Sequence, residues 1–157
     1  MDNQEIERKF LVKGKFKRLA SEQIQIKQGF LSTVPERTFR IRSTGNKGFL
    51  TVKGIGNESG ASRYEFEQEI PVKDARNLLK ICESGLIEKT RYIIPWKNDL
   101  FFEVDEFYGE NEGLIVAELE LPSEDTAFEK PEWLGEEVTG DVRYYNAMLM
   151  KNPFKSW

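Results

Sequence analysis

The residues with the clearest chemical potential lie near the start of the chain, where Glu5, Glu7 and Lys9 occupy every second position. Side chains of a β-strand alternate between its two faces, so these three groups would share one face, with Ile6, Arg8 and Phe10 on the other. A face that carries two carboxylates and an ammonium suits a divalent cation held beside an anion. If the segment is a strand, this spacing predicts a site for a metal ion and an anionic ligand.

Charged residues at alternate positions recur in six later segments. The basic segments contain Arg40 and Arg42, Lys53, and Lys89 and Arg91, and the acidic ones contain Glu65, Glu67 and Glu69, Glu103 and Asp105, and Glu118 and Glu120. The simplest interpretation is a sheet with one charged face in water, which is common in antiparallel sheets. We favour charges that line the interior of a barrel, because neighbouring like charges destabilise a sheet unless metal ions and a polyanion neutralise them.

The elements that must position these residues follow from the same alternation. It predicts eight β-strands, near residues 4–13, 24–32, 37–44, 48–54, 62–70, 87–96, 100–107 and 114–121. Apolar residues at helical spacing predict helices over 73–84, ended by Gly85, and over 141–151, with a shorter helical turn at 15–21. Short connections indicate an antiparallel meander, and closure removes its exposed edges. The predicted fold is α+β, an eight-stranded antiparallel β-barrel (tunnel) with helices packed on the outside.

Length and composition narrow the class of protein. The 157 residues fit a single domain spanning 1–157. No stretch approaches the roughly 20 apolar residues of a membrane-spanning helix, and the single Cys82 suits a reducing compartment, so we expect a cytoplasmic protein without a membrane partner. The net charge of −4 argues against nucleic-acid binding. The chain has no histidine, which leaves carboxylates as ligands for a hard ion such as Mg²⁺ or Mn²⁺.

The basic positions indicate the ligand. Arg40 and Arg42 lie two residues apart, and each guanidinium can bind phosphate oxygens through two N–H groups. Cationic side chains of other segments would surround the same anion: Lys9, Lys53, Lys89 and Arg91. So many cations together with a metal exceed what a single phosphate needs, so the predicted ligand is a small-molecule triphosphate. Catalysis would consist of positioning and charge stabilisation, with water activated by the metal as the nucleophile.

Taken in order, these motifs resemble the signature of the CYTH domain, or triphosphate tunnel metalloenzyme, superfamily, and in particular its small bacterial members. Glu5-x-Glu7-x-Lys9 resembles the motif that opens these domains, and the run from Val138 to Tyr144 resembles their C-terminal segment. One position departs from the pattern. Many relatives have tyrosine where this chain has Phe30, so any role of that phenol in proton handling or in closing the tunnel is absent here.

The resemblance implies a triphosphate bound in a tunnel with one or two divalent ions, Mg²⁺ or Mn²⁺, and a homodimer. By motif, the expected metal ligands are Glu5, Glu7, Asp105, Glu118 and Glu120, and the expected substrate-binding residues are Lys9, Arg40, Arg42, Lys53, Lys89 and Arg91. The expected catalytic residues are Glu5, Glu7 and Lys9, and the residues expected to complete an acidic wall are Glu65, Glu67 and Glu103.

Three functions fit these features. The favoured one is a metal-dependent hydrolase of inorganic triphosphate (a tripolyphosphatase) or of a related organic triphosphate. A class IV adenylate cyclase, which makes cyclic AMP from ATP, would bind the triphosphate through the same charged set. A non-catalytic binder of nucleotides or polyphosphate would have little need for so many carboxylates, so their number favours an enzyme.

Two further segments are expected near the tunnel. The glycine-containing stretch 54–60 lacks the Gly-Lys-Ser/Thr of a P-loop, and we interpret it as a mobile loop at the barrel mouth. For the helix predicted over 141–151, packing against the barrel is favoured over a lid or a plug at one end of the tunnel.

Overall fold

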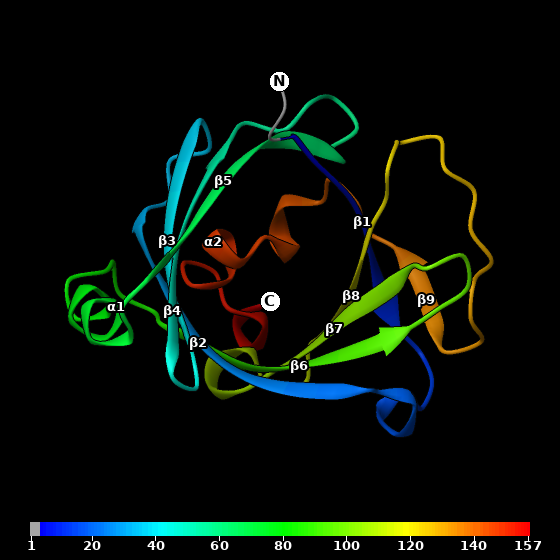
Figure 1. Cartoon of the computed structure of the whole chain (residues 1–157), viewed down its shortest axis with the longest axis horizontal. Coiled ribbons are helices and arrows are strands. Elements are labelled where there is room, and N and C mark those ends of the chain that lie inside the picture. The colour runs from blue at the N-terminus through cyan, green and yellow to red at the C-terminus, as the bar shows by residue number, and fades with distance from the viewer. Residues whose placement is uncertain (1–3) are drawn as a thin grey trace.

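The computed structural model describes residues 4–157, so the first three residues of the expected domain 1–157 lie outside the description. The strands of the barrel are β1 (Gln4–Val12), β2 (Glu22–Ser32), β3 (Arg37–Thr44), β4 (Lys47–Gly54), β5 (Ser62–Ile70), β6 (Ile87–Pro95), β7 (Phe101–Phe107) and β8 (Ile115–Glu120). They are hydrogen-bonded in the order β5-β4-β3-β2-β6-β7-β8-β1, all antiparallel, and pairing of β1 with β5 closes the ring (Figure 1). The predicted eight-stranded antiparallel barrel is confirmed.

Each strand begins and ends within two residues of its predicted range. A further strand, β9 (Leu134–Glu137), was not predicted. It pairs with β1 through Phe10 and Val12, which follow in sequence the β1 residues that pair with β5. Its four residues show no alternation of apolar and polar side chains. Pairing with β1 holds them in the strand conformation, and no pattern in their own sequence predicts it.

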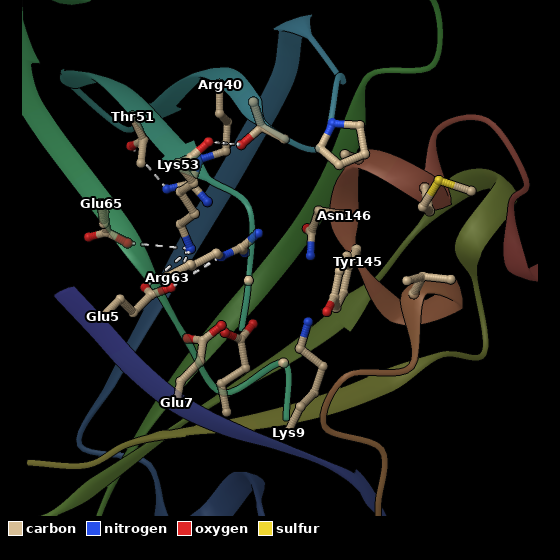
Figure 2. Close-up of a pocket in the computed structure, with 18 of the residues that line it drawn as sticks. Glu5, Glu7, Lys9, Arg40, Thr51, Lys53, Arg63, Glu65, Tyr145 and Asn146 are labelled. Carbon is tan, nitrogen blue, oxygen red and sulfur yellow. Dashed lines mark hydrogen bonds and ion pairs between the residues drawn. The ribbon is translucent and has the colours of Figure 1, made fainter. Parts of the chain in front are cut away.

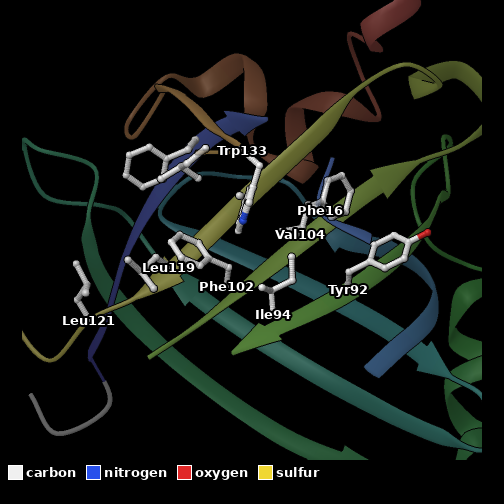
Figure 3. Close-up of a cluster of buried hydrophobic side chains, with 11 residues drawn as sticks. Phe16, Tyr92, Ile94, Phe102, Val104, Leu119, Leu121 and Trp133 are labelled. Carbon is white, nitrogen blue, oxygen red and sulfur yellow. The ribbon is translucent and has the colours of Figure 1, made fainter. Parts of the chain in front are cut away.

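The largest apolar core lies on the outside of the barrel wall. Outward side chains of β1, β6, β7 and β8, among them Phe10, Phe102 and Leu119, pack under the segment that contains Trp133 and Leu134 (Figure 3). These residues alternate in sequence with the charged ones, so burying them under this segment turns the charged residues inward. The fold thus provides the orientation on which the expected site depends.

Helix α1 (Val72–Leu79) packs on the outside of the barrel, as predicted, and buries Ala75 and Leu79 against Ile41 of β3 (Figure 1). It is shorter than the predicted 73–84, because its last helical residue is followed by Lys80 as the C-cap and the chain then continues in turns. Gly85 therefore does not cap this helix. It has φ 97° and lies against the backbone of Met150.

The close approach of α1 to the barrel makes Gly48 of β4 sensitive to substitution. A Cβ added there would lie 2.6 Å from the Cβ of Ala75 and 3.1 Å from the carbonyl oxygen of Ile70. We expect Gly48→Ala to displace the helix and lower the free energy of unfolding by about 1–3 kcal/mol, measured by urea denaturation. Gly54→Ala on the same strand is the control, because its Cβ would meet only Tyr64 at 3.6 Å. Equal losses in both variants would contradict this account.

The C-terminal segment differs from its prediction. It forms the 3₁₀ turn η3 (Val142–Tyr144), the short helix α2 (Asn146–Leu149) and the turn η4 (Phe154–Ser156), in place of one helix over 141–151. The continuous helix is interrupted because Tyr145 is extended, with φ −70° and ψ 134°. Asp141 caps the first of these turns, since its side chain accepts a hydrogen bond from the backbone N–H of Arg143.

This segment also lies in a different place from the one expected. Tyr144 and Leu149 are buried against Ile87, Phe107 and Val116, which share the inward face of their strands with charged residues of the barrel. The segment therefore fills one end of the barrel interior, and Figure 1 shows it within the outline of the ring. The expectation that all helices pack outside is wrong for α2, and the alternative of a plug at one end describes it better.

Two shorter elements complete the chain. The 3₁₀ turn η1 (Lys17–Leu19) matches the helical turn expected at 15–21, and η2 (Gly109–Asn111) connects β7 to β8. Within the described part of the chain, the helices are too short and too polar to cross a lipid bilayer.

Candidate functional site

The barrel encloses a cavity of about 630 Å³. Every predicted site residue except Asp105 lines it: Glu5, Glu7, Lys9, Arg40, Arg42, Lys53, Glu65, Glu67, Lys89, Arg91, Glu103, Glu118 and Glu120. Figure 2 shows such side chains of β1, β3, β4 and β5 extending into a common space. Residues from seven strands, far apart in sequence, therefore meet in one enclosed site.

Carboxylates face one another where β1, β7 and β8 adjoin. Glu7 is opposite Glu120 in the strand register, and Glu103 is opposite Glu118. Enclosure in the barrel, followed by the charge of Glu118, raises the pKa of Glu7 well above its usual value, and Glu7 shares a hydrogen bond with Glu118. Burial alone would raise the pKa of Glu118 too, but Lys9 and that hydrogen bond outweigh burial and hold it well below its usual value. The two neighbouring carboxylates are thus shifted in opposite directions, the pKa of Glu7 upward and that of Glu118 downward.

Glu5 is engaged by cations from the neighbouring strands. Lys53 Nζ lies 2.8 Å from its Oε1, and Arg63 Nε lies 3.7 Å from the same atom. Burial raises the pKa of Glu5, although Lys53 opposes the shift. Lys53 also reaches Glu65 at 3.3 Å, so one ammonium links two carboxylates of the wall.

Asp105 lies behind the cavity wall, where it binds two basic residues. Its carboxylate accepts hydrogen bonds from Arg91 Nε at 2.8 Å and Nη2 at 2.9 Å, and it pairs with Lys89 Nζ at 2.7 Å. Both Asp105 and Lys89 are 1% exposed. Burial lowers the pKa of Lys89 to about 8 against the opposing effect of Asp105. Because these cations occupy the carboxylate, its contacts suit the positioning of Lys89 and Arg91 better than metal binding.

Arg40 and Arg42 point into the cavity from β3. Arg40 Nη2 donates to Thr51 Oγ1 at 3.1 Å, and Arg42 Nη2 lies 3.5 Å from Glu67 Oε2. The Nε–H groups of both arginines are buried and make no hydrogen bond within residues 4–157. Burial, followed by the charges of Arg40 and Arg91, lowers the pKa of Arg42 to about 9. A bound polyanion would accept hydrogen bonds from these unused Nε–H donors and offset the repulsion between the guanidinium groups.

The carboxylates that line the cavity have the chemistry that a divalent cation needs. They offer only oxygen donors, and the opposed pairs Glu7–Glu120 and Glu103–Glu118 bring like charges together, which a cation between them would offset. Across the described residues, no three carboxylates already converge as a ready-made metal site. Holding an ion would therefore require some of these side chains to turn toward it.

The loop between β4 and β5 lies at the cavity, as expected for 54–60. Ile55, Asn57 and Glu58 of this loop line the cavity. The Glu124 carboxylate accepts hydrogen bonds of 2.6 Å from Asn57 Nδ2, Ser59 Oγ and Ser62 Oγ. The loop is thereby joined to the segment that covers the outer core, and its expected mobility stays a prediction.

The structure adds lining residues that the motifs did not include. Arg63 precedes Glu65 and Glu67 at the same two-residue spacing, so the alternation itself could have identified it. Tyr145 and Asn146 come from the C-terminal segment, and Figure 2 shows both on the side of the cavity opposite β4 and β5. Their position depends on how that segment enters the barrel, and no local pattern signals it. Phe30 also lines the cavity.

Comparison with known proteins gives consistent matches over most of the chain. A family model described as the CYTH domain matches residues 3–146. A curated relative from Acetivibrio thermocellus, named inorganic triphosphatase, is 46% identical over 154 residues, which cover 98% of this chain and 97% of the relative. A second one of the same name, from Nitrosomonas europaea, is 40% identical over 148 residues, which cover 92% and 95%.

Solved structures match in the same way. The structure of an inorganic triphosphatase is 37% identical, has a TM-score of 0.65 and aligns over 93% of each chain. A Hippeastrum protein, studied as an adenylyl cyclase and described as having a dominant triphosphatase activity, is 16% identical with a TM-score of 0.61, over 76% of this chain and 80% of its own. At that identity the likeness concerns the fold alone.

Proposed function

The chain belongs to the CYTH domain family, and we propose that it is a divalent-metal-dependent triphosphatase that hydrolyses inorganic triphosphate to pyrophosphate and phosphate inside the barrel cavity. The observation that carries the proposal is the cavity of about 630 Å³, in which two half-buried arginines with unused, buried Nε–H donors face a wall of carboxylates. The two curated relatives, both named inorganic triphosphatase, support the same substrate.

In this proposal the basic residues hold the phosphates and orient the chain of phosphorus atoms for in-line attack by water. The substrate-binding residues are Lys9, Arg40, Arg42, Lys53, Lys89 and Arg91. Glu5, Glu7, Glu118 and Glu120 would hold the metal, Mg²⁺ or Mn²⁺, and Glu65, Glu67 and Glu103 would keep the cations in place. When bound, the ion supplies neutralisation of phosphate charge and a lowered pKa of the attacking water. Asp105 takes a positioning role in place of the metal-binding role expected from its motif.

Attack of the water oxygen on a terminal phosphorus forms one P–O bond and breaks the bridging P–O bond, so that pyrophosphate leaves. Negative charge develops on the bridging oxygen, where cationic side chains stabilise it. The proton that the attacking water gives up would pass to a carboxylate of the cavity wall, since the chain has no histidine to accept it. Phe30 provides no hydroxyl group for this step.

A substrate panel tests the proposal against its rivals. Purified protein is incubated with tripolyphosphate, ATP, thiamine triphosphate and pyrophosphate in the presence of Mg²⁺ or Mn²⁺, and phosphate release and cyclic nucleotide are measured. We expect phosphate release to be fastest from tripolyphosphate and to require the metal. Cyclic AMP with pyrophosphate from ATP would support the cyclase, and binding without turnover of any compound would support a non-catalytic binder.

Replacement of Arg42 gives an independent prediction. We expect Arg42→Ala to raise the KM for triphosphate by roughly 10- to 100-fold, because hydrogen bonds to charged groups contribute about 1.5–3 kcal/mol. The melting temperature should change little, since Arg42 repels Arg40 and Arg91 in the free protein. Arg37→Ala is the control, because this arginine is exposed at the start of the same strand and does not line the cavity. An unchanged KM, or a loss of folding in Arg42→Ala, would refute the assigned role.

A further inference from the structure

One wall of the barrel cavity is made by the C-terminal segment, and the side chain of Asn146 in this segment hydrogen-bonds to Lys89 of the basic strand β6. Asn146 opens helix α2, whose Leu149 is fully buried against the inward apolar residues of the barrel end. Tyr145 lies beside it, with its ring 5.1 Å from Lys9 Nζ and 5.5 Å from Arg63 Cζ. The backbone that carries Asn146 is thus held on both sides, and its amide is presented to the cavity at a fixed place.

The amide oxygen of Asn146 accepts two hydrogen bonds from buried donors. Gln28 Nε2 lies 2.8 Å from Oδ1, and Lys89 Nζ lies 2.9 Å from the same atom. An ammonium is only a donor, so the amide atom that faces Lys89 must be the oxygen. Gln28 and Lys89 are 0% and 1% exposed, so water cannot replace Asn146 as their acceptor without entering the wall.

These contacts fix the direction of the Lys89 ammonium. An ammonium carries three N–H donors on a flexible stem and normally rotates freely. Here Asp105 Oδ2, at 2.7 Å, takes one donor and Asn146 Oδ1 takes a second. The third donor is left for the cavity, which Lys89 lines. Asn146 is also uncharged, so unlike a second carboxylate it orients Lys89 without cancelling the positive charge that attracts a polyanion.

We infer that Asn146 is a positioning residue that, together with Asp105, aims the third N–H of Lys89 at a phosphate oxygen of the bound triphosphate. The inference rests on the proposed function for the identity of the ligand. It assigns to the C-terminal segment a part in substrate binding that acts through a residue of β6. It predicts that Asn146 contributes to binding only while Lys89 is present.

A double-mutant cycle tests this dependence. Inorganic triphosphate is titrated calorimetrically into metal-free protein in EDTA, so that no turnover occurs, for wild type, Asn146→Ala, Lys89→Met and the double variant. We expect Asn146→Ala to weaken binding roughly tenfold in the wild-type background and to have no further effect when Lys89 is methionine. Equal weakening in both backgrounds, or none in the wild type, would overturn the inference.

A matched control and a second readout cover the case in which Lys89→Met does not fold. Asn152→Ala makes the same chemical change six residues further on, at an exposed asparagine whose side chain accepts a hydrogen bond from Ser156 Oγ, and binding should stay at the wild-type level. In nitrogen-15 NMR, the Lys89 ammonium should exchange slowly with water in wild type and Asn152→Ala and rapidly in Asn146→Ala. Slow exchange in all three proteins would contradict the positioning role.

The outcome is separable from that of the proposed function. If the wild-type protein binds triphosphate but does not hydrolyse it in Mg²⁺, the proposed activity is refuted. The role of Asn146 is then still decided by the double-mutant cycle. If the wild type hydrolyses triphosphate but binds it no more tightly than Asn146→Ala does, the role of Asn146 is refuted and the proposed function stands.

Discussion

Replacing Glu7 by glutamine is expected to reduce metal-dependent hydrolysis of triphosphate by at least about 100-fold while leaving the melting temperature unchanged or higher. Substitution of residues that merely support metal ligands lowers activity by about 10- to 100-fold, so loss of a ligand should exceed that range. Stability should not fall, because the pKa of Glu7 is raised and its charged form is disfavoured in the folded protein. Glutamine resembles the protonated side chain and removes the repulsion from Glu118.

The measurement is the rate of phosphate release in Mg²⁺ together with thermal melting in the absence of metal. Glu69→Gln is the control, since this glutamate of β5 is exposed and does not line the cavity, and both quantities should stay near the wild-type values. Turnover by Glu7→Gln within a few-fold of wild type would remove Glu7 from the metal site. A large drop in its melting temperature would indicate a structural carboxylate instead.

Asp105→Asn is expected to give the largest loss of stability, about 3–5 kcal/mol in the free energy of unfolding. The variant keeps the shape of the side chain but leaves Lys89 and Arg91 without the buried carboxylate that pairs with both. Uncompensated charges in an enclosed wall are costly because water cannot solvate them. The measurement is equilibrium denaturation by urea near neutral pH.

The neighbouring Glu106 gives a matched control. It lies on the other face of β7 and pairs at 3.0 Å with Lys17, whose side chain is 53% exposed. Such exposed pairs contribute at most about 1 kcal/mol, so Glu106→Gln should lie near the wild type. If the two variants lose similar stability, Asp105 is not the residue that fixes the cations of β6.

The barrel and its lining were predictable from the sequence because one pattern determines both. The alternation sets which residues share a face of the sheet. Because neighbouring charges of one sign must be neutralised by ligands, the charged face was expected to line the interior. Glu5, Arg42 and Glu120 were therefore expected to meet although they lie on three strands. Arg63 obeys the same alternation as Glu65, with the opposite sign of charge.

The plugged end of the barrel was not predicted, although part of its signal was present. On four strands, the inward-facing positions beyond the charged residues are apolar: Leu11, Ile87, Phe107 and Val116. One end of the barrel interior is therefore apolar, and another apolar segment must cover it. The choice of partner could not be seen. The spacing of Tyr145, Met148 and Leu149 also fits a helix on the outside, and only the extended backbone at Tyr145 breaks that helix.

The roles of individual carboxylates depend on packing that no spacing encodes. Glu103 and Asp105 share one face of β7, yet Glu103 lines the cavity and Asp105 lies behind it, held by Arg91 and Lys89. The shorter aspartate side chain stays close to the strand, where its neighbours on β6 reach it. A motif that counts both as acidic residues cannot separate a carboxylate that lines the cavity from one that holds basic side chains behind the wall.

The most direct test of the central claim is a crystal structure of the metal-free protein soaked with inorganic triphosphate, a condition without turnover. We predict that the triphosphate lies inside the barrel, in contact with Arg40, Arg42 and Lys89, and that the Nε–H groups of the two arginines gain phosphate oxygens as acceptors. An empty cavity with triphosphate bound on the outer surface, in a protein that still hydrolyses it, would contradict the account.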